Sequence, residues 1–206
     1  MTDIITIVDY GMGNIGSISN MIKKAGGTSQ TTSDVNIIQA ATKLLLPGVG
    51  AFDAGVESLK KSKLIDVLNK KVLIDKTPVL GICLGMQLMT NKSEEGTLKG
   101  LSWIDAETIK FESTDIQFRI PHMGWNQVSK LKNHDILENV DVNEARYYFV
   151  HSYYVKCHNS DDALLKCDYI SDFDAAYQKE NIFGFQFHPE KSHKYGMQII
   201  KNFISL

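Results

Sequence analysis

The sequence predicts an α/β protein with a mostly parallel central sheet, helices on both faces and added antiparallel strands. In the first half of the chain, short apolar runs alternate with amphipathic stretches, as in β-α-β units. From about residue 100 the pattern changes to aromatic, alternating segments separated by polar turns, which favours partly antiparallel strands. No Pro/Gly/Ser-rich linker separates the two halves, so residues 1–206 are expected to form a single domain.

Three strands rich in Val, Ile and Leu are expected to be covered on both faces of the sheet. They are Ile4–Val8, Lys43–Leu46 and Val79–Ile82. Residues 15–25 carry apolar side chains at helical spacing, and Gly26-Gly27 then supplies a stop. The same spacing predicts a second helix over residues 59–73, ahead of Pro78.

Four segments of the second half predict the added strands, because aromatic residues alternate with polar ones in them. They are residues 101–111, 145–157, 172–180 and 181–190. A last helix is predicted over residues 195–203.

Composition excludes several classes of partner. The formal net charge is −2, so the chain has no positive potential that would attract a polyanion. Arg119 and Arg146 are the only arginines, which leaves few side chains for bidentate binding of phosphate groups. Neither nucleic acid nor a membrane is expected as a partner. The chain shows no signal peptide and no run of roughly 18 apolar residues, which indicates a cytoplasmic protein.

The three cysteines are Cys83, Cys157 and Cys167. Their odd number, without a C-x-x-C pair or a histidine at zinc spacing, argues against a disulfide framework and against a metal site. One of these thiols is instead a candidate for a reactive group.

Gly11-Met12-Gly13-Asn14-Ile15-Gly16 follows the first strand with the G-x-G-x-x-G spacing of a dinucleotide-binding turn. That fingerprint also needs an acidic residue about 20 positions further on. Asp34 is near enough, but it lies in TTSDVN, which has the composition of a polar turn. NAD is therefore not expected as a ligand.

Gly81-Ile82-Cys83-Leu84-Gly85 has the G-x-C-x-G pattern of a nucleophile elbow between a strand and a helix that begins near Met86. The glycines at i−2 and i+2 leave room for a strained turn, and a helix N-terminus favours the thiolate. The alternative is that Cys83 is a buried core thiol, but the two flanking glycines favour a nucleophile.

In His188-Pro189-Glu190, the histidine is a candidate general base, and the Glu190 carboxylate could orient its ring. Pro189 disfavours the helical conformation at His188, and an extended chain would present His188 and Glu190 on one face. The other histidines lack such a neighbour, and a solvated or core role is expected for them: His122, His134, His151, His158 and His193.

Acyl transfer also needs an oxyanion hole. The Leu84 N–H follows the nucleophile, and the turn Pro47-Gly48-Val49-Gly50 leaves a strand in the same half of the fold. This turn could supply a second donor, or it could be no more than a flexible connection.

Six motifs together resemble the class I glutamine amidotransferases, and most closely HisH, the glutaminase subunit of imidazole glycerol phosphate synthase. The similarity runs in order from Asp9 to Phe203. The motifs are PGVGAF (47–52), GICLGMQ (81–87), SEEG (93–96), PHMGWN (121–126), YFVHSY (148–153) and FHPEKS (187–192).

The resemblance implies a flavodoxin-like fold, no cofactor, and a catalytic triad of Cys83, His188 and Glu190. Cys83 would attack the side-chain amide of L-glutamine, while His188 moves the proton and Glu190 orients His188. The oxyanion hole would come from Val49 and Leu84. The implied glutamine pocket comprises Gly50, Gln87, Glu95, Ser152 and Tyr153, with Glu95 meeting the α-ammonium.

The resemblance also implies a protein partner, a HisF-like TIM-barrel synthase subunit that receives the ammonia through a channel. The implied interface lies in residues 9–14 and 121–126 and includes Asn14, Met123, Trp125 and Asn126. Taken in isolation, Trp125 would be expected in a core.

Several alternatives stay open. Gly16 stands where many HisH chains carry Arg, and GLSWIDAETIKF and EKSHKYGMQIIKNF are similar to HisH paralogues that supply ammonia for acetamidino sugars in surface polysaccharides. A stand-alone γ-glutamyl hydrolase, a cysteine peptidase of similar fold and an inert binding module are weaker possibilities.

Overall fold

The computed structural model describes residues 4–141 and 143–206. In this part of the chain the strands form a sheet of eleven and a separate pair. The large sheet contains β1 (Ile4–Val8), β2 (Thr28–Thr32), β3 (Lys43–Leu46), β4 (Val79–Ile82), β5 (Lys92–Ser93), β6 (Ala106–Lys110), β8 (Ser129–Lys130), β10 (Tyr153–Cys157), β11 (Ala163–Asp168), β12 (Asp172–Lys179) and β13 (Ile182–Phe185). The pair is β7 (His122–Gln127) with β9 (Arg146–His151).

Six α-helices and several single turns connect the strands of the described residues. The helices are α1 (Ile15–Lys24), α2 (Val35–Gln39), α3 (Phe52–Lys61), α4 (Ile65–Asn69), α5 (Leu84–Leu88) and α6 (His193–Ser205). A π-helical turn (Lys70–Ile74) extends α4, and 3-10 turns occupy Asp135–Leu137, Ser160–Asp162 and Pro189–Lys191.

The sheet has a parallel half and an antiparallel half, as predicted. Strands β2, β1, β3, β4 and β13 lie side by side and all run in one direction. From β13 onward the order continues through β12, β10 and β6 with antiparallel pairing. The three predicted parallel strands have the predicted bounds.

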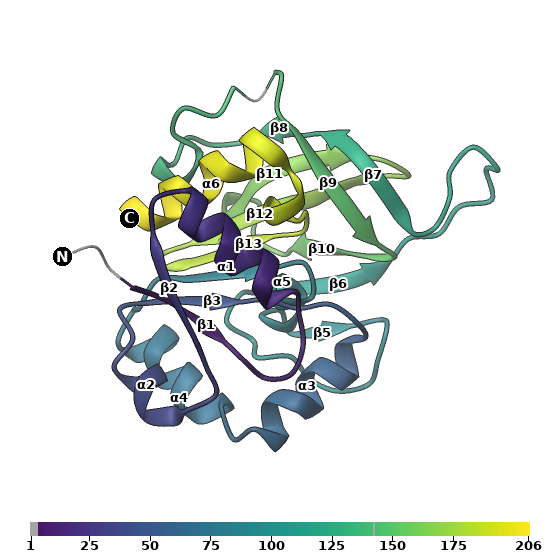
Figure 1. Ribbon diagram of the computed structural model, residues 1–206. Coiled ribbons are helices and arrows are strands. Elements are labelled where there is room, and N and C mark those ends of the chain that lie inside the picture. The colour runs from purple at the N-terminus through teal and green to yellow at the C-terminus, as the bar shows by residue number, and fades with distance from the viewer. Residues whose placement is uncertain (1–3, 142) are drawn as a thin grey trace.

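Helices cover both faces of the sheet. In Figure 1, α1 and α6 lie together on one face, while α2, α3 and α4 cover the other. The alternation along the strands explains the two cores, because Ile5, Ile7 and Leu45 pack with the α1 and α6 side chains. Leu44 and Leu46 pack with α3 and α4 on the opposite face.

The prediction of one continuous helix over residues 59–73 is wrong, because a break divides these residues between two helices. Helix α3 begins earlier, at Phe52, and ends at Lys61, shortly before Lys63 takes a left-handed φ of 56°. A second helix, α4, then begins at Ile65. The apolar residues keep a helical spacing across this break, because Leu59, Val67 and neighbouring apolar side chains from both helices pack in the same core.

The aromatic segments are also more divided than expected. Residues 145–157 form β9 and β10, which belong to different sheets and meet at Ser152. The strand expected within residues 101–111 begins only at Ala106, and β13 ends at Phe185, before the catalytic candidates.

Asp34 and Gly16 do not behave as parts of a dinucleotide site. The Asp34 carboxylate caps α2 by accepting the Asn36 N–H at 2.7 Å and the Ile37 N–H at 3.3 Å. Gly16 has open space around its Cα, so no close backbone approach requires a glycine there.

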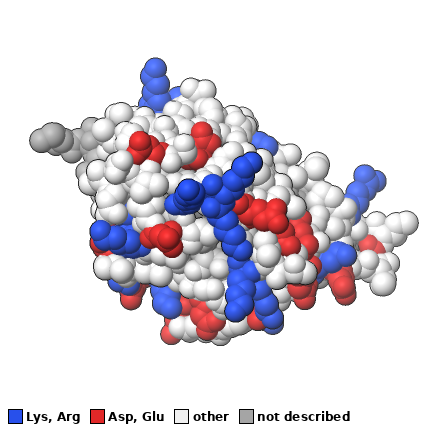
Figure 2. Space-filling model, turned by 90° about the horizontal axis from the view of Figure 1, so that it is seen from below, with Lys and Arg blue, Asp and Glu red and all other residues white. Residues whose placement is uncertain are grey.

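Charges of both signs are interspersed on the face that α2, α3 and α4 cover, which is the face seen in Figure 2. Among the described residues, none of the helices has the length and apolar character that crossing a membrane would need.

The parallel strands set the position of the site. Strands β1, β3, β4 and β13 all end at the same edge of the sheet. In open α/β sheets this carboxyl edge is where ligands bind. Cys83 follows β4 at this edge, and His188 lies three residues beyond β13.

Candidate active site

Cys83 sits on a strained turn between β4 and α5. Its φ of 53° and ψ of −112° are unusual for a residue other than glycine. A Cβ on Gly85 would lie 1.9 Å from the Leu46 carbonyl oxygen, and one on Gly81 would lie 2.4 Å from Met89 Cε. The flanking glycines are therefore needed for the reason that the sequence suggested, close packing around the turn.

Helix α5 contributes less to thiol chemistry than expected. It spans Leu84–Leu88, only five residues, so its dipole is short. Activation of Cys83 as a nucleophile must then come mainly from neighbouring side chains.

His188 is the side chain best placed for that task. Its Nδ1–H donates to Glu190 Oε1 at 2.8 Å, and both side chains are 2% exposed. The expected contact is present, and His188 itself is extended as predicted, with φ −97° and ψ 98°. The residues after it are not extended. Pro189–Lys191 form a 3-10 turn that folds Glu190 back onto the ring, and Ser192 Oγ secures this turn by donating to the His188 carbonyl at 2.7 Å.

The electrostatics of His188 favour its charged form. Burial lowers the pKa of His188, but its contacts with Cys83 and Glu190 outweigh burial and raise the pKa from 6.5 to about 9. Nε2 is buried and makes no hydrogen bond with any described residue. This nitrogen therefore remains available to exchange a proton with the thiol or with a leaving group.

The pKa of His188 predicts how stability depends on pH. The folded protein holds this proton more tightly than the unfolded chain, so the free energy of unfolding should decrease as pH rises from about 6.5 to about 9. Urea unfolding at both ends of this range measures the effect. His188→Gln, which lacks the titrating ring, should lose part of the decrease, and an identical slope in both proteins would contradict the assignment.

A cavity of about 350 Å³ opens beside Cys83 and His188. The structure brings nearly the whole predicted site together there. The cavity is lined by Val49, Gly50, Cys83, Leu84, Gln87, Glu95, Pro121, Val150, His151, Ser152, Tyr153 and His188. Both oxyanion candidates and all five candidate glutamine-binding residues are in this lining, while Glu190 lies behind His188.

Glu95 is held by contacts that join its loop to the start of α3. Its Oε2 accepts the Phe52 N–H at 2.8 Å. Asp53 holds the same loop by accepting the Thr97 N–H at 2.9 Å and the Leu98 N–H at 3.0 Å, and these bonds lower the pKa of Asp53. The loop that carries Glu95 is thus tied to the start of α3 at three backbone N–H groups.

The turn around Val49 packs directly on the elbow. A Cβ on Gly48 would come within 2.6 Å of the Gly85 nitrogen, and Gly50 has a φ of 113°. Tyr10 Oη donates to the Pro47 carbonyl at 2.5 Å. These contacts place the backbone of residues 47–50 against the N-terminus of α5.

The candidate partner residues lie outside the cavity. Met123 and Trp125 are 62% and 46% exposed on β7, and Trp125 stacks on His193 with ring centroids 5.3 Å apart. The expectation of a core position for Trp125 in isolation is therefore wrong. Asn14 is exposed and caps α1, whereas Asn126 points to the other side of β7 and is half-buried.

The other two thiols are poor nucleophiles. Cys157 and Cys167 are buried, and burial raises the pKa of each. Among the described residues, no group of three or more His, Cys, Asp and Glu side chains could hold a metal ion.

Sequence reasoning missed two features of the site. His151 lines the cavity, although a solvated or core role was expected for it. Gln186, which is fully buried, donates its Nε2–H to Cys83 Sγ at 3.8 Å. The one available signal was its position two residues before His188 in FQFHPE.

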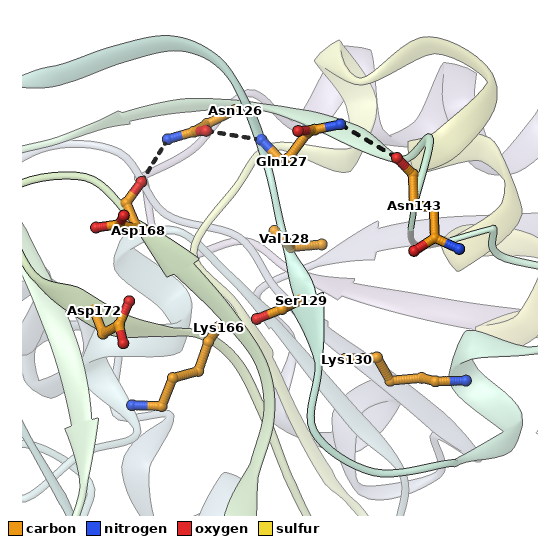
Figure 3. Close-up of a pocket in the computed structure, with 9 residues that line it drawn as sticks. All are labelled: Asn126, Gln127, Val128, Ser129, Lys130, Asn143, Lys166, Asp168 and Asp172. Atoms are coloured by element: carbon orange, nitrogen blue, oxygen red, sulfur yellow. Dashed lines mark hydrogen bonds between the residues drawn. The ribbon is translucent and has the colours of Figure 1, made fainter.

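A larger cavity of about 720 Å³ lies elsewhere, between β7 and the strands β11 and β12 (Figure 3). Asn126 is the only candidate site residue in its lining. Lysine, aspartate and amide side chains surround it, and none of the triad residues contributes. This cavity borders the back of the candidate partner strand rather than the chemistry.

Comparisons with known proteins give one consistent result. Residues 6–206 match the family described as glutamine amidotransferase class-I. The chain is 54% identical to imidazole glycerol phosphate synthase subunit HisH 2 of Methanococcus maripaludis over 97% of this chain and 98% of that one. It is 51% identical to the protein of the same name from Pseudomonas aeruginosa over 98% and 99%. The solved structure of PurLQS from Thermotoga maritima shares the fold, with a TM-score of 0.72 at 15% identity, covering 100% of this chain and 98% of that one.

Proposed function

The chain belongs to the class-I glutamine amidotransferase family, and we propose that it is a HisH-type glutaminase subunit that hydrolyses L-glutamine to glutamate and ammonia. The observation that carries the proposal is the single cavity that joins the strained Cys83, the His188–Glu190 pair and the anchored Glu95. No metal or cofactor takes part in the proposed steps.

The reaction begins at Cys83. Its sulfur forms a bond to the side-chain amide carbon of glutamine, and the carbonyl electrons move to the oxygen. The backbone N–H groups of Val49 and Leu84 stabilise this oxyanion. His188 Nε2 delivers a proton to the amide nitrogen, the C–N bond breaks, and ammonia leaves a thioester on Cys83.

Water completes the cycle. His188, now neutral, takes a proton from water, and the hydroxide adds to the thioester carbon. The second oxyanion collapses, glutamate is released, and the thiolate returns to Cys83. Glu190 keeps His188 in one tautomer and supports its positive charge throughout.

Substrate recognition follows from the fixed groups of the cavity. The Glu95 carboxylate, held at the start of α3, binds the α-ammonium of glutamine. Backbone groups at Ser152 and Tyr153 bind the α-carboxylate. Gln87 donates to the Tyr153 carbonyl at 2.9 Å and so keeps this side of the pocket in place.

The proposed partner is a HisF-like TIM-barrel synthase subunit that receives the ammonia in the cytoplasm, as in imidazole glycerol phosphate synthase of histidine biosynthesis. Met123 and Trp125, two large exposed side chains on β7, support an interface there. Asn14 and Asn126 complete the proposed surface.

The proposal predicts that a HisF-like partner protein accelerates glutamate release by at least about tenfold, because the binding of a partner and the chemistry at Cys83 are coupled. Glutamate is measured with and without the purified partner. Equal rates would reject the channelled function and favour a stand-alone hydrolase.

A second acceptor pathway fits the same chemistry. The relatives from Methanococcus maripaludis and Pseudomonas aeruginosa are both named HisH 2, and Gly16 departs from the Arg of many HisH chains. In this alternative the ammonia serves the amidination of a sugar for surface polysaccharide. The same assay separates the two, because stimulation by a histidine-pathway HisF supports the first, and stimulation only by a barrel protein encoded beside this chain supports the second.

A further inference from the structure

A row of polar side chains runs through the interior from β7 to Cys83. At its outer end, Asn126 Nδ2 donates to His122 Nε2 at 3.3 Å. His122 Nδ1 lies 3.0 Å from His151 Nε2, and His151 Nδ1 lies 2.8 Å from the Tyr153 carbonyl oxygen. Both imidazoles are buried, with 3% and 6% of their surfaces exposed.

The row continues to the nucleophile through two glutamines. Gln87 Nε2 donates both to the Tyr153 carbonyl at 2.9 Å and to Gln186 Oε1 at 3.0 Å. Gln186 Nε2 then donates to Cys83 Sγ at 3.8 Å. Every consecutive pair of side chains from Asn126 to Cys83 is joined directly or through the Tyr153 carbonyl.

The Tyr153 carbonyl determines the direction of the histidine bonds. A carbonyl only accepts, so His151 Nδ1 carries the proton and His151 Nε2 is the acceptor. His122 Nδ1 must then be the donor, which leaves His122 Nε2 to accept from Asn126. Burial lowers the pKa of His122 to about 4 and that of His151 to about 3, so both rings are neutral near pH 7, as this arrangement requires.

Asn126, at the outer end of this row of side chains, belongs to β7 and is held there by two further hydrogen bonds. Asn126 Nδ2 also donates to the Asp168 carbonyl at 3.0 Å, and its Oδ1 accepts the Gln127 N–H at 2.8 Å, as Figure 3 shows. Met123 and Trp125 project from the opposite side of the same strand. A partner that displaces β7 would therefore move Asn126, and a buried polar group cannot lose its bond without cost.

We propose that Asn126, His122, His151, Gln87 and Gln186 form one hydrogen-bonded chain that positions the Cys83 thiol according to the state of β7. Docking on the exposed face of β7 and attack by Cys83 are then coupled through side chains. The coupling rests on the proposed function, because it needs a partner on β7. The inner end, Gln186 on Cys83, does not.

His122→Phe tests the outer part of the chain. The new ring can stay stacked between Phe149 and Tyr169, whose centroids lie 4.8 and 4.0 Å from that of His122, but it has no ring nitrogen. We expect the ratio of partner-stimulated to basal glutaminase activity to fall by about tenfold or more. If wild type is stimulated and His122→Phe is stimulated equally, the chain is rejected; if wild type is not stimulated, the proposed function fails instead.

Two further variants make this result interpretable. Tyr169→Phe keeps the stacking on His122 and removes a hydroxyl that bonds the Arg119 backbone outside the chain, so its ratio should match wild type. A ratio that falls as far as in His122→Phe would assign the effect to packing and reject the chain. Should His122→Phe fail to fold, His122→Asn can keep a donor toward His151 while losing the acceptor for Asn126, and it should also lower the ratio.

Gln186→Leu tests the inner end without a partner. Loss of the N–H donor that holds the sulfur in place should lower the rate at which iodoacetamide alkylates Cys83 by about threefold or more. Gln186→Glu, which keeps the acceptor for Gln87 but presents no amide N–H to sulfur, should lower the rate in the same way. Alkylation rates identical to wild type in both variants would overturn the role of Gln186.

Discussion

Replacement of Cys83 by serine should abolish glutamate release from glutamine, with a loss on the order of 10³-fold or more. A serine hydroxyl is a weaker acid and a poorer nucleophile than a thiol, so it would attack the amide carbon of glutamine far more slowly. Cys83 is 8% exposed and lines a cavity to which Met123 and Trp125 do not contribute, so partner binding should persist. Glutamate is assayed in the presence of the partner, and complex formation is measured by titration calorimetry.

Cys157→Ala is the matched control for this variant. Cys157 is 9% exposed and does not line the cavity of Cys83, so its removal should leave glutaminase activity in place. Wild-type activity in Cys83→Ser with a competent partner would show that the nucleophile is wrongly assigned. Loss of partner binding in that variant would show that Cys83 also contributes to the interface.

Elements whose structure depends on residues close together in the sequence were predictable. Strands β1, β3 and β4 are runs of Val, Ile and Leu covered on both faces, and they have the predicted bounds. The elbow at Cys83 was also predictable, because the need for glycine at positions 81 and 85 is local. His188 and Glu190 are only two residues apart, so their contact was predictable although the backbone is extended at His188 alone and turns at Pro189–Lys191.

The parts that depend on contacts between distant segments were not predictable. Strand β2 is a polar run, TSQTT, and it forms a strand because it pairs in parallel with the edge of β1. Gln186 bonds to Cys83, 103 residues away, and His122 to His151, 29 residues away. Nothing near these residues in the sequence indicates such pairs. The grouping of the pocket itself came from resemblance rather than from pattern.

Gly85→Ala should have the largest effect on folding, with a loss of stability greater than about 4 kcal/mol. The added Cβ would lie 1.9 Å from the Leu46 carbonyl oxygen and 3.2 Å from the Pro47 carbonyl carbon. These are backbone atoms of β3 and of the Val49 turn, so no side-chain rotation can relieve the overlap. Soluble yield and urea unfolding measure the loss, and surviving protein should show an impaired glutaminase because the turn moves relative to Cys83.

Gly16→Ala is the control, because it adds the same methyl group where the structure has room. No atom lies within 4 Å of that Cβ position, and Gly16 is in the first turn of α1. Alanine there should stabilise the protein by about 0.5–1 kcal/mol, since it restricts the unfolded chain and favours the helix. Equal stability of the two variants would mean that the elbow is not packed against β3 in solution. A Gly16 variant that is destabilised instead would indicate a contact at the start of α1 that requires glycine.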